Sequence, residues 1–103
     1  CEHLPKSARI AHRYALVRSV THADNGHGSA MYAAFTGFPH RFPNTNPIPD
    51  VDDFPAYGCV VSHLRPPAGP VPGFVAVGGT QFVCGNQIPG QRAGFLGPAY
   101  EPY

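Results

Sequence analysis

Apolar residues show a helical spacing at the start of the chain and then a continuous run. Over 4–14 they recur with the helical period, and Pro5 stands in a first turn, where its missing N–H costs little, so we predict a short helix there. Residues 15–21 are rich in β-forming side chains, and Ala15, Leu16 and Val17 are all apolar. Such a run predicts a strand covered on both faces, as in a parallel sheet. A helix followed by a buried strand is typical of an α/β fold.

A polar loop over 21–28 separates this predicted strand from the next predicted helix. Residues 29–35 favour a helix, and Gly37 is expected to end it, because glycine readily adopts the conformation found after helices. The loop therefore lies between the end of a strand and the start of a helix. In open α/β sheets this is the place where ligands bind.

An irregular segment and a third helix follow. Residues 38–53 hold four prolines together with several Asn and Asp, which predict an extended surface segment. Asp53 is expected to cap a helix that has Pro55 just inside its start. An apolar stripe with helical spacing ends before Pro66 and consists of Phe54, Tyr57, Val60, Val61 and Leu64.

The C-terminal third combines a short apolar run with many glycines. Residues 74–77 predict a second buried strand. Beyond Gly78, glycines interrupt every apolar cluster, so we predict an irregular segment. A structureless segment of this length is unusual in a compact domain, and we expect it either to bind a ligand or to complete its packing elsewhere.

Composition changes this picture by suggesting that the chain is incomplete. Its 13 Pro and 12 Gly are about twice the average share and exclude long uninterrupted helices. Charged residues make up 13%, about half of the ordinary share, whereas 43% of residues are hydrophobic, which excludes intrinsic disorder. A self-contained domain of 103 residues needs more polar surface than this. We therefore expect residues 1–103 to be a single partial domain.

Charge and cysteine content exclude several classes of protein. The formal net charge is +1, and the basic residues are scattered, so a nucleic-acid partner is not expected. No apolar stretch is long enough for a membrane span, and the first residues lack the features of a signal peptide. Cys1, Cys59 and Cys84 lack zinc-knuckle spacing. They are expected either as reduced thiols or with one disulfide between Cys59 and Cys84.

Four candidate chemical groups lie within the polar loop and the start of the following helix. His22 and Asp24 are ordinary ligands for a divalent metal. His27 and Ser29 are candidate catalytic groups, because a helix N-terminus favours an anionic nucleophile, and the N–H groups near Gly28 could bind an oxyanion. The alternative is structural: a turn at Asp24, a Ser29 helix cap and solvent-exposed histidines.

Two further polar groups have similar alternatives. His40 and Arg41 could bind an anion or be solvated turn residues. The acidic residues Asp50, Asp52 and Asp53 are better explained by capping and solvation than by calcium, because the spacing of a calcium loop is absent.

Several short motifs, in this order, resemble the family called domain of unknown function 1501, a sulfatase-like group within the alkaline-phosphatase superfamily. They are LVRSVTH at 16–22, Asn25, HG at 27–28, AFTG at 34–37, DFP at 53–55, PGFV at 72–75 and GFLGPAYEPY at 94–103. More distantly, Thr36-Gly37 and the Pro39-His40-Arg41 run are similar to the second half of the sulfatase signature. His27 and Met31 then stand where that signature has its nucleophilic cysteine and its arginine.

The resemblance implies a fragment of a sulfatase-like α/β sandwich with short helices, two buried strands and long Pro/Gly-rich loops. It implies a metal-dependent hydrolase of a small anionic ester, inactive as a fragment, whose partner is the missing remainder of the parent domain. A divalent metal is expected in that parent and not tightly on the fragment. The resemblance also suggests an exported bacterial protein, either periplasmic or at the cell surface. Because the cysteine and the arginine are replaced, the alternative is a non-catalytic binding or scaffold protein.

Overall fold

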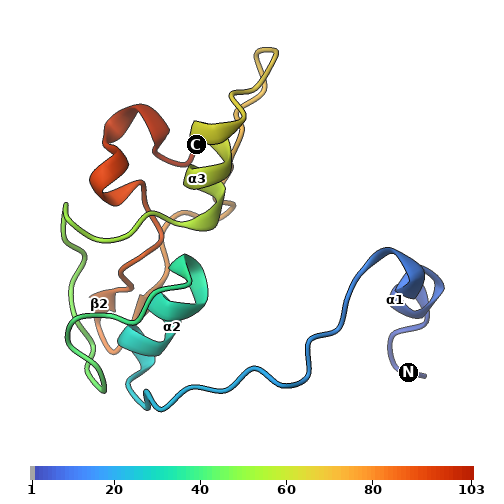
Figure 1. Ribbon diagram of the computed structural model, residues 1–103, viewed down its shortest axis with the longest axis horizontal. Helices are drawn as coiled ribbons and strands as arrows, with labels where there is room; N and C mark the ends of the chain where they lie inside the picture. The colour runs from blue at the N-terminus through green and yellow to red at the C-terminus, as the bar shows by residue number, and fades with distance from the viewer. Residues whose placement is uncertain (1) are drawn as a thin grey trace.

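The computed structural model describes residues 2–103 and begins with a helix that stands apart from the rest of the chain. Helix α1 spans Pro5–Arg9, with Pro5 in its first turn, and a 3-10 turn, η1, spans Ala11–Arg13. The predicted first helix is therefore confirmed, although it is divided. In Figure 1 an extended segment connects this pair to the rest of the chain.

The strand predicted over 15–21 does not form, and this prediction is wrong. The segment is extended, but among the described residues no second strand pairs with it. The neighbours Leu16 and Val17, which point to opposite faces of an extended segment, are 76% and 67% exposed, so neither face is covered. A run of β-forming side chains becomes a strand only when a neighbour supplies the hydrogen bonds of the ladder.

Helix α2 spans His27–Thr36 and confirms the second predicted helix, with two additional residues at its start. Gly37 ends it as predicted: its φ of 80° lies in the left-handed region, and its N–H donates to the carbonyl of Ala33. Tyr32 and Thr36 form the buried face of the helix.

Helix α3 spans Tyr57–Leu64 and begins later than predicted. Ala56, not Asp53, occupies the N-cap position, and Pro55 lies outside the helix. The predicted apolar stripe is also not the buried face, since Tyr57, Val61 and Leu64 are exposed while Cys59 is fully buried.

The main core lies between α3 and the end of the chain. It consists of Ala56, Cys59 and Ala93, with Phe74, Leu96 and Tyr100 packed against it. Two 3-10 turns, η2 (Gly94–Leu96) and η3 (Pro98–Tyr100), carry the C-terminal part of this core. Small residues at the centre let the backbones approach closely: the Ala56 N–H donates to the Arg92 carbonyl at 2.9 Å.

A small antiparallel hairpin replaces the predicted irregular segment beyond Gly78. Its strands are β1 (Phe82–Val83) and β2 (Asn86–Gln87). Cys84 and Gly85 form the turn, with φ values of 50° and 82°, as a two-residue hairpin turn of the primed type requires.

The prediction of a second buried strand over 74–77 is likewise wrong. Instead, its backbone exchanges two hydrogen bonds with Tyr103, and Val77 is 95% exposed. The described chain therefore has a mixed composition of short helices and one two-stranded antiparallel sheet, rather than two buried parallel strands.

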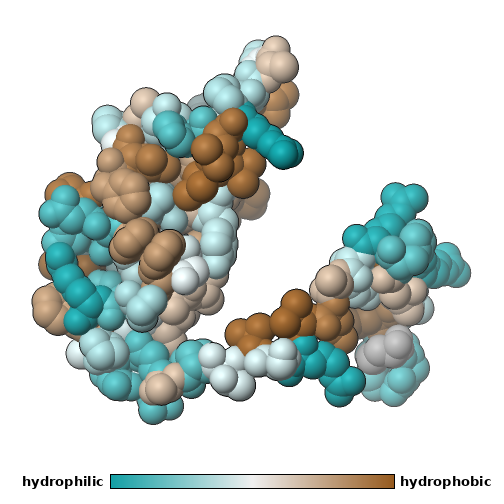
Figure 2. All heavy atoms as spheres, viewed as in Figure 1, coloured by the Kyte–Doolittle hydropathy of each residue, from teal (hydrophilic) through white to brown (hydrophobic). Residues whose placement is uncertain are grey.

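Much of the apolar surface lies open. Figure 2 shows apolar side chains along the extended segment before α2 and around α3. The radius of gyration is 15.6 Å, compared with about 13 Å for a compact domain of 100 residues. Within residues 2–103, no helix has the length and apolarity that a membrane crossing requires.

Candidate functional site

The polar loop before α2 is organised around the carboxylate of Asp24. Its Oδ1 accepts hydrogen bonds from the Ser29 hydroxyl at 2.7 Å, the Asn44 N–H at 2.8 Å and the Gly26 N–H at 2.9 Å. One oxygen atom therefore joins the loop, the first turn of α2 and the segment around residue 44. We call Asp24, Gly26, Ser29, Asn44 and Thr45 the Ser29 network.

Ser29 is fully buried at the centre of this network. Besides donating to Asp24, its hydroxyl lies 3.1 Å from the Thr45 carbonyl oxygen and accepts from the Thr45 N–H at 3.2 Å. The Ser29 N–H donates to the same Thr45 carbonyl. Ser29 is not a helix cap, because α2 has no side-chain cap. Its hydroxyl instead fastens α2 to a segment sixteen residues away.

Backbone N–H groups at the start of α2 and in the loop before it are already engaged: those of Gly28 and Ser29 in the helix and that of Asn25 in the loop. The Gly28 N–H, a predicted oxyanion donor, donates to Oδ1 of Asn46 at 2.8 Å, and the Asn25 N–H donates to Oδ1 of Asn44 at 2.8 Å. Asparagine side chains thus occupy part of the place where an anion was predicted to bind. Anion binding at Gly28 stays a prediction that requires Asn46 to move.

The predicted metal ligands and catalytic histidine lie around this network. His22 and His27 are exposed, whereas Asp24 is partly buried and directs Oδ1 into the Ser29 network. Among residues 2–103, no three His, Cys, Asp or Glu side chains converge as a metal site would require. The described residues alone therefore do not form a metal site of three or more such ligands.

Asp24 makes the stability of the network depend on pH. Desolvation of the carboxyl acts to raise its pKa, but hydrogen bonds from Ser29, Gly26 and Asn44 outweigh it, so the pKa lies below the ordinary value of 3.8. A carboxyl with a lowered pKa stabilises the folded state above its unfolded-state pKa, and this contribution disappears as the pH falls through the folded-state value.

We therefore expect Asp24→Asn to reduce stability at neutral pH and to flatten the decline of stability as the pH falls below the ordinary carboxyl value of 3.8. Urea unfolding followed by circular dichroism at a series of pH values measures both effects. If the free energy of unfolding depended on pH in the same way in the variant and in the unsubstituted chain, this account of Asp24 would be contradicted.

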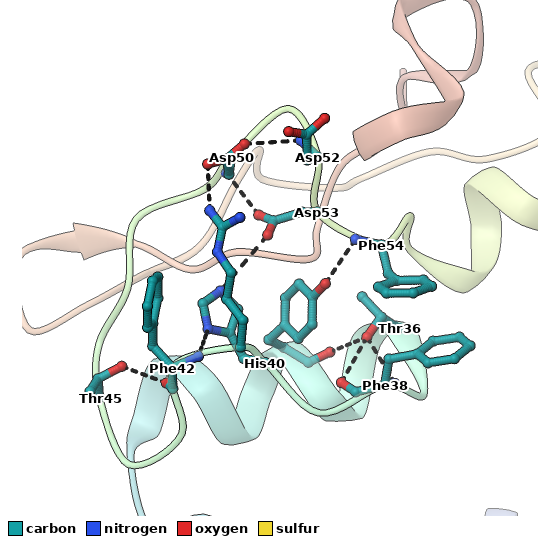
Figure 3. A network of polar contacts seen from close by, with 11 residues as sticks. Thr36, Phe38, His40, Phe42, Thr45, Asp50, Asp52, Asp53 and Phe54 are labelled. Atoms are coloured by element: carbon teal, nitrogen blue, oxygen red, sulfur yellow. Dashed lines mark hydrogen bonds and ion pairs between the residues drawn. The ribbon is translucent and has the colours of Figure 1, made fainter.

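A second polar cluster surrounds His40, which was predicted as either an anion ligand or a solvated turn residue. Its side chain is only 2% exposed, so the solvated alternative is wrong. Nδ1 of His40 accepts from the Phe42 N–H at 3.0 Å, which places the proton of the neutral ring on Nε2. Nε2 faces Oδ1 of Asp53 at 3.8 Å and has no hydrogen-bond partner (Figure 3).

Tyr32 and Asp53 complete what we call the His40 network. The Tyr32 ring packs edge-on against His40, and its hydroxyl accepts from the Phe54 N–H at 2.8 Å. Oδ2 of Asp53 accepts from the Asp50 N–H at 2.8 Å. Burial raises the pKa of Asp53 despite this bond. Asp53 was predicted to be a solvated helix cap, but it is a buried side chain that binds the Asp50 N–H and faces His40.

Arg41 is paired rather than free for an anion. Its guanidinium donates to Oδ2 of Asp50, and it lies 5.3 Å from the centre of the Phe42 ring. The pair with Asp50 raises the pKa of Arg41. An anion at His40 and Arg41 would therefore compete with Asp50, and this role stays a prediction.

Two hollows adjoin the His40 network. A cavity of about 150 Å³ is lined by Tyr32, His40, Arg41 and Asp53, among others. A wider cleft of about 510 Å³ lies between residues 49–54 and the C-terminal segment. Its walls include the acidic side chains of Asp50, Asp52, Asp53 and Glu101. Arg92 lines this cleft as well, but it is paired with Glu101 at 3.1 Å. The wider cleft is therefore acidic and unsuited to an anionic ester.

Sequence reasoning missed Asn44, Thr45 and Asn46 as partners of the polar loop. They lie in the segment that was predicted only as irregular. The available signal was their residue type, because Asn, Asp, Ser and Thr side chains often bond to backbone groups in turns. That signal predicts local turns, but it does not name a partner nearly twenty residues away.

The comparisons with known proteins assign the chain to a family. Neither a curated protein nor a solved structure matches it. The sequence model described as "Protein of unknown function (DUF1501)" matches residues 1–103. This match spans the Ser29 network, the His40 network and the C-terminal motif, and the chain therefore belongs to the DUF1501 family.

Proposed function

We propose that this chain is part of a sulfatase-like α/β sandwich, and that residues 22–29 line the site of a hydrolase acting on a small anionic ester. The family match over the whole chain supports the proposal. The observation that carries it is the difference between hydrogen-bonded and exposed side chains within this loop. Asp24 and Ser29 are tied into the Ser29 network, while His22 and His27 are left exposed beside it.

In this proposal His22 and His27 take part in the reaction, and the Ser29 network holds the loop that carries them. Imidazole is the side chain that most often transfers protons near neutral pH, so His27 would give a proton to the leaving oxygen of the ester, while His22 and Asp24 would help to hold the metal. The catalytic role predicted for Ser29 would require it to give up its bonds to Asp24 and Thr45. A positioning role needs no such rearrangement.

The metal of such a hydrolase would depend on ligands from outside this chain. His22 and Asp24 alone are too few for a fixed divalent site. The exposed apolar residues of 15–21 and 74–77 support the same view, because they require covering elements. We accordingly expect the chain alone to be inactive, and we propose export, as for relatives, only for the complete protein.

The test is hydrolysis of generic phosphate and sulfate esters by the complete protein, supplied with divalent metal. His27→Ala should lower the rate by about a hundredfold or more, the usual loss for a proton-transfer group. His12→Ala, an exposed histidine on η1, is the matched control and should keep full activity. An inactive complete protein, or equal rates for both variants, would overturn the proposal.

A second candidate function is a non-catalytic binding or scaffold protein with the same fold. The burial of Ser29, the only hydroxyl predicted as a nucleophile, favours it. In that case the complete protein would bind inorganic phosphate or sulfate without hydrolysing either ester. Calorimetry with both anions, run beside the ester assay, separates the two functions.

A further inference from the structure

An exposed cysteine and an exposed histidine meet at the start of α2, outside both networks described above. Sγ of Cys84 lies 3.9 Å from Nδ1 of His27, although the two residues are 57 positions apart in the chain. The thiol is free. We propose that this pair is a surface site for a thiophilic divalent cation of the zinc and cadmium type.

The distance between the two atoms suits one shared ion. Zinc lies about 2.3 Å from a thiolate sulfur and about 2.1 Å from an imidazole nitrogen, so a single ion reaches ligands up to about 4.4 Å apart. The observed 3.9 Å is within that reach. The ion takes the place of the thiol proton between Sγ and Nδ1, and that proton passes to solvent.

The two ligands are held together by the structure around them. Cys84 lies in the β1–β2 turn, and Asn86 of the same hairpin donates to the Asn46 carbonyl at 3.2 Å. Asn46 in turn accepts from the N–H of Gly28, the neighbour of His27. Asn46 thus links the hairpin to the first turn of α2. This arrangement lowers the cost of bringing sulfur and nitrogen to one ion.

Of the two described thiols, only that of Cys84 can reach a cation from solvent. Cys59 is fully buried in the core, and burial raises its pKa to about 11. Within residues 2–103 no third His, Cys, Asp or Glu joins the pair as a ligand. Water fills the remaining positions, so the site is open and its affinity is modest. The proposal does not rest on the hydrolase proposal, because it concerns binding alone.

Cadmium titration of the chain in a Cys1→Ser background tests the site. Calorimetry should give one ion per chain, with release of a proton, and ultraviolet spectra should show a band from the cadmium–thiolate bond. His27→Ala should weaken binding by about tenfold or more, since a lost ligand costs at least as much as a lost supporting contact. His12→Ala is the matched control and should bind as the background chain does.

Cys84→Asn removes the thiol in a form that suits the turn, because Asn-Gly is favoured in this turn type. It should abolish the ultraviolet band while circular dichroism stays unchanged. Equal cadmium affinity in His27→Ala and His12→Ala would mean that the thiol binds cadmium without His27, and it would overturn the proposal. Persistence of the band in Cys84→Asn would overturn it as well.

Discussion

Gly94→Ala should lower the free energy of unfolding by about 3 kcal/mol, the sum of a steric overlap and a backbone strain. Gly94 has a φ of 50°, and a Cβ there would overlap the carbonyl oxygen of Asp53. That carbonyl also accepts from the Phe95 N–H at 3.1 Å. The methyl group would therefore separate η2 from the segment that leads into α3, and open the core around Cys59.

Urea unfolding followed by far-ultraviolet circular dichroism measures this loss. Gly85→Ala is the matched control, because Gly85 in the hairpin turn also has a positive φ, 82°, but open space around its Cβ position. It should lose only about 1–2 kcal/mol, the cost of the backbone conformation alone. If both variants lost the same stability, close packing at Gly94 would not be what joins η2 to residue 53.

Gly26→Ala should disrupt the Ser29 network by a steric effect alone. The φ of Gly26 is −76°, which any residue adopts, but a Cβ would overlap the backbone of Asn44 and Thr45. We expect a loss of about 3 kcal/mol, since overpacking against rigid backbone costs about 1–3 kcal/mol and the Ser29–Thr45 hydrogen bonds would also break.

Native-state hydrogen exchange shows where this loss occurs. The N–H groups of Ser29 and Thr45 should exchange faster in Gly26→Ala, whereas amides in α3 should change less, because the main core is separate. Gly69→Ala is the control, since nothing lies near its Cβ position, and it should change stability by no more than about 0.5 kcal/mol. Unchanged exchange at Ser29 would contradict the proposed role of Gly26.

The two glycine variants separate the two parts of the described fold. Gly94 joins the C-terminal segment to the approach to α3, and Gly26 joins the polar loop to the segment around Thr45. A loss confined to the Ser29 network in one variant and to the main core in the other would show that the two parts unfold separately.

Asp24 and Ser29 could be singled out from the sequence, but the residues that they contact could not. Asp24 and Ser29 were identified from their position before a helix, and the structure places them 2.7 Å apart. The structure also shows that Ser29 binds Thr45 and that His27 contacts Cys84. Both contacts join segments that are distant in sequence, so no local pattern could indicate them.

Local sequence was sufficient for α2 and for the break that follows it. The helix-forming run and the left-handed Gly37 depend on interactions within a few residues, and such interactions are present in the sequence itself. Local sequence also indicated that residues 15–21 favour an extended backbone, which they have. It could not supply the neighbour that would turn this segment into a strand.

Tertiary contacts decided which faces are buried. On α3 the apolar stripe was visible in the sequence, yet Cys59 is the buried residue, because Ala93 and Leu96 pack against that side. His40 is buried for a similar reason, since Asp53 and Tyr32 reach it from distant positions. Backbone conformation is set largely by neighbours along the chain, whereas burial depends on which segments meet, and only the folded structure contains that information.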